Sequence, residues 1–443
     1  MPHLSRSLLL VLAISLTLTL TSSSWATSQE RVLYSFTGRG DGAHPQSTLI
    51  FDGNGSLYGT ASNGGSIACV GAVSGCGTVF ELSPFSDGAW TQKVLYSFQG
   101  GADGAVPNSL VFDRKGNLYG TTLVGGGTGC LNSAGAGCGT VFKLMYTHGQ
   151  WVESVLYRFQ GGADGGFPEG VMFDGAGHLF GTTACSGIGC SGESNCGVVF
   201  ELTPSHVLWK EAVLSYFCSA NGETPNPGLV FGPAGTIFGT TWGGGDGQIC
   251  QCGTIFLLRP NGQGQWNQTV LHSFGAGPNG GQPAGGLIAD KEGNLYGPIY
   301  YGGTGGAGTL FEFSRLSPSY DGRHFNLIWD FDSTNIAQPD SVLNSDSQGN
   351  LYGTTDTNLD YRTCFCGAVF KLIRSDNGSW QETTLYEFTG GSDGAYPLAR
   401  VILDSAGNLY GTTYVGGTGD CTYQGTGCGV VYEIMQGIAN PDQ

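Results

Sequence analysis

The chain has 443 residues, of which 79 are glycine, and a formal net charge of −17 at pH 7. The chain has 34 acidic residues but only 17 lysines and arginines. Nucleic acid and anionic membranes bind basic protein surfaces, so both are poor partners for this chain. Apolar residues make up 40% of the chain, enough for a globular core, and the glycines lack the every-third spacing of collagen.

The first 26 residues have the features of a secretory signal. Arg6 supplies positive charge, residues 8–20 form an apolar segment shorter than a membrane span, and Ser24-Trp25-Ala26 is an acceptable cleavage site. We therefore expect residues 1–26 to be removed and the product to be exported, whether extracellular, on the cell surface or periplasmic. No later apolar run reaches membrane length and residues 437–443 form a short polar tail, so we expect no membrane span or anchor in the mature chain.

Fourteen cysteines fit an exported protein with disulfides. Zinc is the less favoured alternative, because the second cysteine of each pair stands before Gly and a strand, with few histidines nearby. The pairs expected within repeats are Cys69–Cys76, Cys130–Cys138, Cys190–Cys196, Cys250–Cys252, Cys364–Cys366 and Cys421–Cys428. Cys185 and Cys218 are left over, and we expect them to pair with each other. The two Cys-x-Cys pairs would close strained rings.

One motif, Gly-Asn-Leu-Tyr-Gly-Thr-Thr at residues 116–122, recurs along the chain. Its central glycines are Gly59, Gly120, Gly181, Gly239, Gly297, Gly353 and Gly411, so successive copies are 56 to 61 residues apart. A period this regular indicates a repeat architecture.

Each repeat has four short apolar segments separated by turn residues. In the second repeat these segments are residues 109–113, 117–122, 138–144 and 151–159, with a Gly/Cys-rich loop at 123–137. Four such segments predict an antiparallel sheet. We therefore predict an all-β fold for residues 27–436, a seven-bladed β-propeller with four antiparallel strands in each blade.

The register of the repeats predicts how the ring closes. Residues 32–36, Val-Leu-Tyr-Ser-Phe, copy the fourth strand, whereas residues 429–434 copy the third. We expect the N-terminal strand, residues 31–36, to complete the last blade, which is otherwise formed by residues 399–404, 409–413 and 430–434. This pairing would leave no open sheet edge at the seam.

Two kinds of recurrent residue have structural explanations. In most repeats a tryptophan stands eight residues before the Phe that ends the fourth strand, and an aspartate ends the first strand. The tryptophans are Trp90, Trp151, Trp209, Trp266 and Trp380, and the aspartates are Asp52, Asp113, Asp174, Asp290, Asp346 and Asp404. We expect the tryptophans to pack between blades and the aspartates to form turns.

The loops that enter the first strand carry an Asp-Gly-x-x-Pro motif. Its aspartates are Asp41, Asp103, Asp164 and Asp393. These loops should lie on the same face as the Gly/Cys-rich loops, where four carboxylates around the channel would suit a cation such as calcium. The alternative, that Asp-Gly makes a tight turn before Pro, explains both residues, and the motif is degenerate in repeats four to six.

Positions at which the repeats differ are better candidates for ligand binding. The residue after Gly-Thr-Thr is Trp242, Tyr300, Asp356 or Tyr414 in four of the repeats, with Tyr301 beside Tyr300. Arg400 and Asn344 also depart from the small or apolar residues of other first strands. Aromatic faces with acidic residues suit neutral carbohydrate or peptide; the alternative is scattered surface aromatics and ordinary drift.

The motif string resembles the GloVer tandem repeat over nearly all of the mature chain. The matching residues are Val-Leu-Tyr-Ser-Phe, Gly-Gly-Ala-Asp-Gly-x-x-Pro, Gly-Asn-Leu-Tyr-Gly-Thr-Thr and Cys-Gly-Thr-Val-Phe. That repeat occurs in exported bacterial proteins called choice-of-anchor, whereas this chain shows no evident anchor. The first two strands are more weakly similar to NHL-type propellers. The resemblance implies export and repeat architecture, but no activity or catalytic residues.

Three functions fit these observations. The first is an exported module that binds a glycan, peptide or protein through the Gly/Cys-rich loop face. The second is a propeller-type lyase or glycosidase acting on extracellular polymer, which would need paired carboxylates from several blades. The third is a purely structural envelope protein. Because the chain has no phosphate loop, we favour binding over catalysis.

Overall fold

The computed structural model describes most of the expected mature chain. The described residues are 28–66, 69, 75–127, 130–132, 135–185, 196–205, 209–246, 250, 252–275, 277–314, 324–332, 336–358, 364–421 and 427–436. The expected signal sequence, the polar tail and Cys190 lie outside them. None of the described residues forms a helix that is long and apolar enough to cross a membrane.

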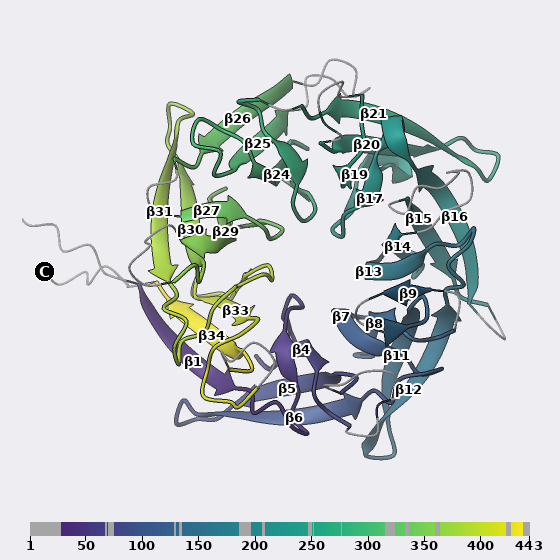
Figure 1. The fold of residues 1–443 in the computed structure, drawn as a ribbon, viewed down its shortest axis with the longest axis vertical. Helices are drawn as coiled ribbons and strands as arrows, with labels where there is room; N and C mark the ends of the chain where they lie inside the picture. Colours follow the sequence, from purple (N-terminus) through teal and green to yellow (C-terminus); the bar gives the residue numbers. More distant parts are fainter. Residues whose placement is uncertain are drawn as a thin grey trace, which may run out of the picture.

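Seven antiparallel sheets stand around a common axis, as the repeat predicted (Figure 1). Blade 1 holds β2 (Ala43–Pro45), β3 (Ile50–Phe51), β4 (Leu57–Asn63), β5 (Thr78–Pro84) and β6 (Trp90–Ser97). Blade 2 holds β7 (Ala105–Phe112), β8 (Leu118–Val124), β11 (Thr140–Thr147) and β12 (Gln150–Arg158), with the small ribbon of β9 (Leu131–Asn132) and β10 (Gly135–Ala136) in its loop. Blade 3 holds β13 (Gly166–Phe173), β14 (Leu179–Cys185), β15 (Gly197–Thr203) and β16 (Lys210–Phe217).

The remaining blades repeat this order, with the first strand nearest the axis. Blade 4 holds β17 (Glu223–Pro225), β18 (Val230–Phe231), β19 (Ile237–Gly243), β20 (Thr254–Pro260) and β21 (Trp266–Ser273), with the 3-10 turns η1 (Ser219–Asn221) and η2 (Pro233–Gly235). Blade 5 holds β22 (Gly281–Pro283), β23 (Ile288–Ala289), β24 (Leu295–Tyr301), β25 (Thr309–Ser314) and β26 (His324–Asp330). Blade 6 holds β27 (Ile336–Pro339), β28 (Asn344–Ser345), β29 (Leu351–Asn358), β30 (Ala368–Arg374) and β31 (Trp380–Glu387).

Blade 7 is closed by the N-terminal strand, as predicted. Its order is β1 (Gln29–Ser35), β34 (Val430–Met435), β33 (Leu409–Thr413) and β32 (Ile402–Leu403). In Figure 1 the purple N-terminal strand lies along the yellow C-terminal one. The register runs antiparallel from Gln29 opposite Met435 to Ser35 opposite Val430. The two ends of the described chain therefore share one sheet, and the seam has no free edge.

The recurrent Gly-Thr-Thr glycine is required by an aromatic ring on the third strand. A Cβ added at Gly120 would lie 2.6 Å from Cζ of Phe142, inside van der Waals contact. The same ring position is filled by Phe80, Phe142, Phe200, Phe256, Phe311, Phe370 and Tyr432. Only a residue without a side chain allows the second strand to cross this ring.

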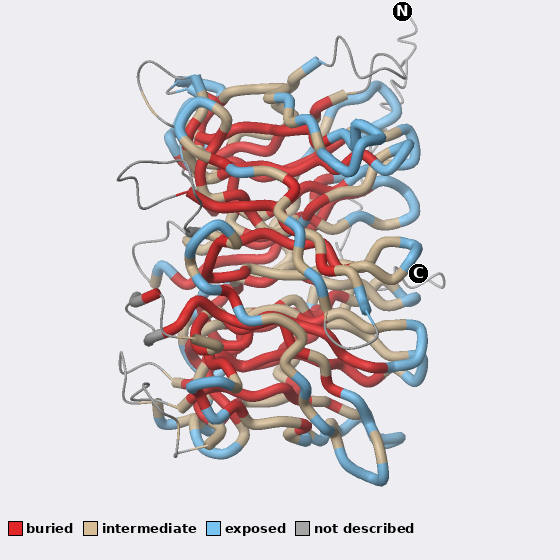
Figure 2. The backbone as a smooth tube through the Cα atoms, turned by 90° about the vertical axis from the view of Figure 1, so that its right-hand side faces the viewer, coloured by how far each residue is buried: buried red, intermediate tan, exposed pale blue. Residues whose placement is uncertain are grey.

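Each of these rings also packs against an aromatic ring that ends the fourth strand of the preceding blade. The pairs are Phe36–Phe80, Phe98–Phe142, Phe159–Phe200, Phe217–Phe256, Phe274–Phe311, Phe331–Phe370 and Phe388–Tyr432. Trp90, Trp209, Trp266 and Trp380 likewise contact an aromatic ring of the preceding blade. The expected packing role of these tryptophans is thereby confirmed. Figure 2 shows the resulting layer of buried strand, with exposed turns along one face.

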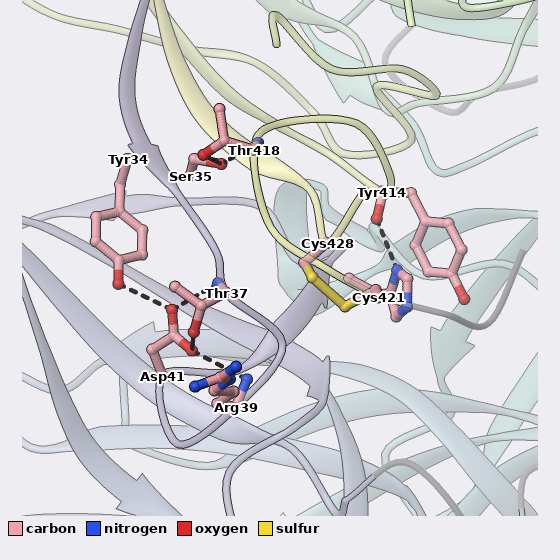
Figure 3. Close-up of a disulfide and its surroundings, with 10 residues drawn as sticks. Tyr34, Ser35, Thr37, Arg39, Asp41, Tyr414, Thr418, Cys421 and Cys428 are labelled. Carbon is pink, nitrogen blue, oxygen red and sulfur yellow. Dashed lines mark hydrogen bonds between the residues drawn. A yellow bond between two sulfur atoms is a disulfide. The ribbon is translucent and has the colours of Figure 1, made fainter. Parts of the chain in front are cut away.

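Five of the predicted disulfides are present in the structure. The structure contains Cys69–Cys76, Cys130–Cys138, Cys250–Cys252, Cys364–Cys366 and Cys421–Cys428. The last of these lies beside the N-terminal strand (Figure 3). Disulfides of this number belong to proteins of oxidising compartments, which supports export.

The predicted pairs Cys190–Cys196 and Cys185–Cys218 are wrong, because Cys196 is bonded to Cys218. Gly197 of β15 lies directly opposite Phe217 of β16, so the cysteines just beyond these two residues meet across the strand pair, with Cα atoms 5.0 Å apart. Pairing by nearness in sequence overlooked this cross-strand neighbour.

We predict that Phe36→Ala costs as much stability as Phe98→Ala, although Phe36 lies near the start of the mature chain. Both side chains are fully buried at 0% exposure, and deleting a buried Phe side chain costs about 3–5 kcal/mol. Urea unfolding of both variants measures the two costs. A much smaller loss for Phe36→Ala would mean that β1 does not close the ring in solution.

We also predict that digestion without reductant releases a peptide joining Cys196 to Cys218. Cys218→Ser should destabilise the protein by about 2–4 kcal/mol, because the bridge closes a long loop. Cys250→Ser is the matched control, since Cys250 and Cys252 are only 2 residues apart in sequence and their bridge should contribute less. A linked peptide that contains Cys190 and Cys196 would contradict the assignment.

Candidate functional site

The aspartates of the Asp-Gly-x-x-Pro loops are held within their own loops. Asp41 accepts hydrogen bonds from the Tyr34 hydroxyl at 2.9 Å, the Thr37 backbone N–H at 2.8 Å and the Thr37 hydroxyl at 2.5 Å (Figure 3). Asp103, Asp164 and Asp393 accept the corresponding bonds from a fourth-strand tyrosine and from the backbone N–H four residues earlier.

These bonds place each carboxylate beside the outermost strand of the blade that precedes its loop. The four aspartates come from separate blades, and the described residues contain no group of three or more His, Cys, Asp or Glu side chains that could hold a metal ion. The turn explanation thus accounts for the loop aspartates better than a calcium ring does. Asp52, Asp113 and the equivalent aspartates also form turns, for example through the bond from the Asn54 N–H to Asp52 at 2.8 Å.

Some of the aromatic residues that follow Gly-Thr-Thr contact one another, and others do not. The rings of Trp242 in blade 4 and Tyr300 in blade 5 are 5.6 Å apart, and the rings of Tyr300 and Tyr301 are 4.7 Å apart. The Tyr300 hydroxyl donates to Oδ2 of Asp356 in blade 6 at 2.5 Å. Four of the predicted ligand-binding residues, Trp242, Tyr300, Tyr301 and Asp356, thus form one group across three blades, which we call the rim cluster.

Tyr414 and Arg400 are not part of the rim cluster. The Tyr414 ring lies 4.7 Å from the His44 ring, and the Tyr414 carbonyl is 2.9 Å from His44 Nδ1, across the seam between blades 7 and 1 (Figure 3). Arg400 Nη2 donates to Asn344 Oδ1 at 2.8 Å, and Asn344 Nδ2 donates to the Val401 carbonyl at 3.0 Å. These bonds join blades 6 and 7.

A cavity of about 370 Å³ occupies the axis of the ring. It is lined by residues that follow the loop proline in blades 1 to 7, and its charged members are Glu169, Asp340 and Arg400. Arg400 Nε is buried and has no hydrogen-bond partner among the described residues. Burial lowers the pKa of Arg400, but a guanidinium stays charged at neutral pH.

Glu169 and Asp340 occupy equivalent positions in the repeat, directly after the proline. The full set is Gln46, Asn108, Glu169, Asn226, Ala284, Asp340 and Leu398. Where this residue is asparagine, its side chain can bind the next blade: Asn108 Nδ2 donates to the Pro168 carbonyl at 3.0 Å, and Asn226 Nδ2 to the Pro283 carbonyl at 2.7 Å. An ionised carboxylate has no proton to donate, so blades 3 and 6 forgo this bond.

The surrounding protein makes both carboxyls weaker acids than usual. Burial raises the pKa of Glu169 to about 7. Burial, together with the nearby charge of Asp356, raises the pKa of Asp340 to about 7. Burial also raises the pKa of Asp356, while the bond from Tyr300 opposes this rise. Asp340 lines the cavity, and its charge interacts with that of Asp356 in the rim cluster.

Sequence reasoning missed Glu169 and Asp340. The available signal was the position after the proline, where five repeats carry neutral residues and two carry acids. Variation is more conspicuous after Gly-Thr-Thr, and the proline loops have the composition of turns.

Comparison with known proteins establishes the family. Three overlapping segments, residues 19–184, 67–265 and 189–426, match the Gloeobacter/Verrucomicrobia repeat, and the chain belongs to this repeat family. The resemblance to the GloVer repeat is thereby confirmed. No curated protein matches the chain.

Solved structures share the fold at low identity. A periplasmic gluconolactonase of Pseudomonas aeruginosa is 15% identical, with a TM-score of 0.48 over 78% of this chain and 85% of its own. The PQQ-bound aldose sugar dehydrogenase of Streptomyces coelicolor is 11% identical, with a TM-score of 0.43 over 93% of this chain and 99% of its own. Likeness at this level shows similarity of fold alone.

We predict that Asp340→Asn stabilises the protein at pH 8.5 by about 1–2 kcal/mol, allowing for water in the cavity. A carboxyl whose pKa is raised by folding contributes most stability below its ordinary pKa and loses that contribution as pH rises through about 7. The gain should therefore disappear near pH 4. The new amide can also donate across the blade interface, as Asn226 does.

Thermal melting at both pH values measures this effect. Asp420→Asn, at an exposed site on the same face, removes the same charge and should change stability little. Equal gains for the two variants would attribute the effect to net charge, not to the cavity.

Proposed function

We propose that this protein is an exported module that binds carbohydrate at the mouth of its central cavity. One observation carries the proposal: Trp242 of blade 4 and Asp356 of blade 6 both contact Tyr300 of blade 5, near cavity residue Asp340. Ligand sites combine apolar and aromatic walls with a few converging polar groups, and the rim cluster has this composition.

The chemistry of the cluster suits a sugar. Aromatic faces pack against the C–H faces of sugar rings, while carboxylates accept hydrogen bonds from hydroxyl groups. Oδ1 of Asp356 is buried and has no hydrogen-bond partner among the described residues. A ligand hydroxyl at this position would satisfy an acceptor that the protein leaves open.

The test is binding of the purified, oxidised protein to a panel of oligosaccharides and polysaccharides. Trp242→Ala should weaken binding by about tenfold or more, which corresponds to about 1.4 kcal/mol, because it removes the largest aromatic face of the cluster. The control is Tyr146→Ala, which removes a tyrosine that is 56% exposed near the β11–β12 turn. Repeating the assay with calcium and with a chelator tests the cation expected from the loop aspartates.

Two results would contradict the proposal. Absence of binding across a broad panel would favour a protein partner or a structural role. Binding that survives Trp242→Ala but is lost in Tyr146→Ala would place the site elsewhere on the molecule.

A second candidate is a lyase or glycosidase that acts on extracellular polymer, and Glu169 is the residue that favours it. Its carboxyl lines the cavity, and burial raises its pKa to about 7, the range in which a carboxylic acid can donate a proton at neutral pH. Shortening of a polysaccharide during the assay, abolished by Glu169→Gln, would establish catalysis. An unchanged chain length would leave binding as the function.

A further inference from the structure

Two carboxylates of blade 6 lie close together where the cavity meets the rim cluster. Pro339 of β27 is the register partner of Thr355 of β29, and Asp340 and Asp356 are the residues that follow them. The Asp340 backbone N–H donates to the Thr354 carbonyl at 3.3 Å. The two carboxylates are near enough that the charge of Asp356 raises the pKa of Asp340, and both charges raise the pKa of Tyr300, whose hydroxyl bonds Asp356.

The described residues supply no positive charge to this pair. Tyr300 donates to Oδ2 of Asp356, but Oδ1 of Asp356 is buried and has no hydrogen-bond partner among the described residues. The Asp340 side chain makes no hydrogen bond or ion pair with any residue that the structure describes. Arg400 lines the same cavity, but it is hydrogen-bonded to Asn344, and its charge is not among the causes of the Asp340 pKa shift.

We propose that Asp340 and Asp356 bind a primary ammonium group, so that the carbohydrate bound at the rim is an amino sugar with a free amine. The inference rests on the proposed function and specifies its ligand class. An ammonium group has three donors, enough to bond both carboxylates at once.

Three further features favour a cation at this position. The Tyr300 ring, bonded to Asp356 through its hydroxyl, and the Trp242 ring beside it lie near the acids, and aromatic rings attract cations to their faces. The net charge of −17 draws cationic ligands to the protein. Burying like charges without a counterion is unfavourable, and an ammonium between the carboxylates would remove this cost.

A divalent metal fits the pair less well. Calcium takes six to eight oxygen ligands, whereas the described residues hold no group of three or more His, Cys, Asp or Glu side chains that could bind a metal. Two carboxylates with neighbouring aromatic rings match an organic ammonium better than a hard cation.

The experiment compares two trisaccharides that differ only in acetylation, the glucosamine trimer and the N-acetylglucosamine trimer. Calorimetric titration at pH 7 should show the free-amine trimer binding about tenfold tighter or more, about 1.4 kcal/mol. Asp340→Asn and Asp356→Asn should each bring the two affinities to within about threefold, about 0.7 kcal/mol. Asp420→Asn, which removes an exposed carboxylate on the same face, should leave the preference intact.

The preference should also depend on pH. Near pH 5 the carboxyl of Asp340, whose pKa is raised to about 7, is protonated, so the free-amine trimer should bind more weakly than at pH 7 although its amines stay charged. The acetylated trimer should change less. The titratable or charged groups around this site are Asp340, Asp356, Tyr300 and Tyr301 on its own side and Glu169 and Arg400 in the cavity wall.

Each other outcome overturns one of the two proposals. Equal affinity of wild-type protein for both trimers, or a preference that survives Asp340→Asn, overturns the ammonium site but leaves carbohydrate binding. If neither trimer binds, melting with ethanolamine decides: stabilisation of wild type but not of Asp340→Asn keeps the ammonium site and rejects the sugar. Stabilisation by calcium alone would make the pair a metal site, and no stabilisation by either probe overturns the ammonium proposal.

Discussion

A hydrogen bond between neighbouring blades, made before each loop proline, fixes the geometry of the whole ring. The residue before the proline has a positive φ in every repeat, from 50° at Thr224 to 62° at Gln282. Its N–H donates to the carbonyl that precedes a glycine of the previous blade, as in Val106 to Cys76 at 2.9 Å and Tyr396 to Cys366 at 2.9 Å. That glycine has no room for a side chain, since a Cβ at Gly253 would lie 2.6 Å from Cδ of Pro283. This left-handed backbone is unfavourable for residues other than glycine, yet it recurs because it joins each blade to the next.

This hydrogen bond between blades, with the proline that follows it, also determines where functional side chains can stand. Because the backbone is fixed through the proline, the side chain of the next residue can vary without altering the ring. It lines the cavity at Glu169 and Asp340 and bonds the following blade at Asn226. Asparagine there adds a bond between blades, as Asn226 does. Glu169 and Asp340 give up this bond and keep carboxyls with pKa values raised to about 7 in the cavity. Residues that weaken a fold while lining a cavity are typical of functional sites.

The sequence predicted the features that repeat and failed where one copy differs or where neighbours come from another strand. Seven copies of one motif specify seven blades, and the misplaced fourth-strand copy at residues 32–36 specifies the closing strand, because each element needs a partner for its edge. The Cys196–Cys218 bond could not be found from spacing, since it depends on β15 and β16 being paired in register. Likewise, Trp242, Tyr300 and Asp356 stand out as variable residues, but only the packing of successive blades shows that they touch while Tyr414 turns to His44.

The acidic pair and the ring architecture place opposite demands on blade 6. With asparagine in place of Asp340, the side-chain amide would bind the neighbouring blade at any pH. The carboxyl instead becomes a buried charge as the pH rises through about 7, and its ionisation lowers the stability of the fold. The ring tolerates the weaker interface at blade 6, because the other contacts of this blade, including the Phe331–Phe370 and Phe388–Tyr432 ring pairs, remain in place. A bound cation would restore the missing interaction, so ligand binding and the closing of this interface should stabilise each other.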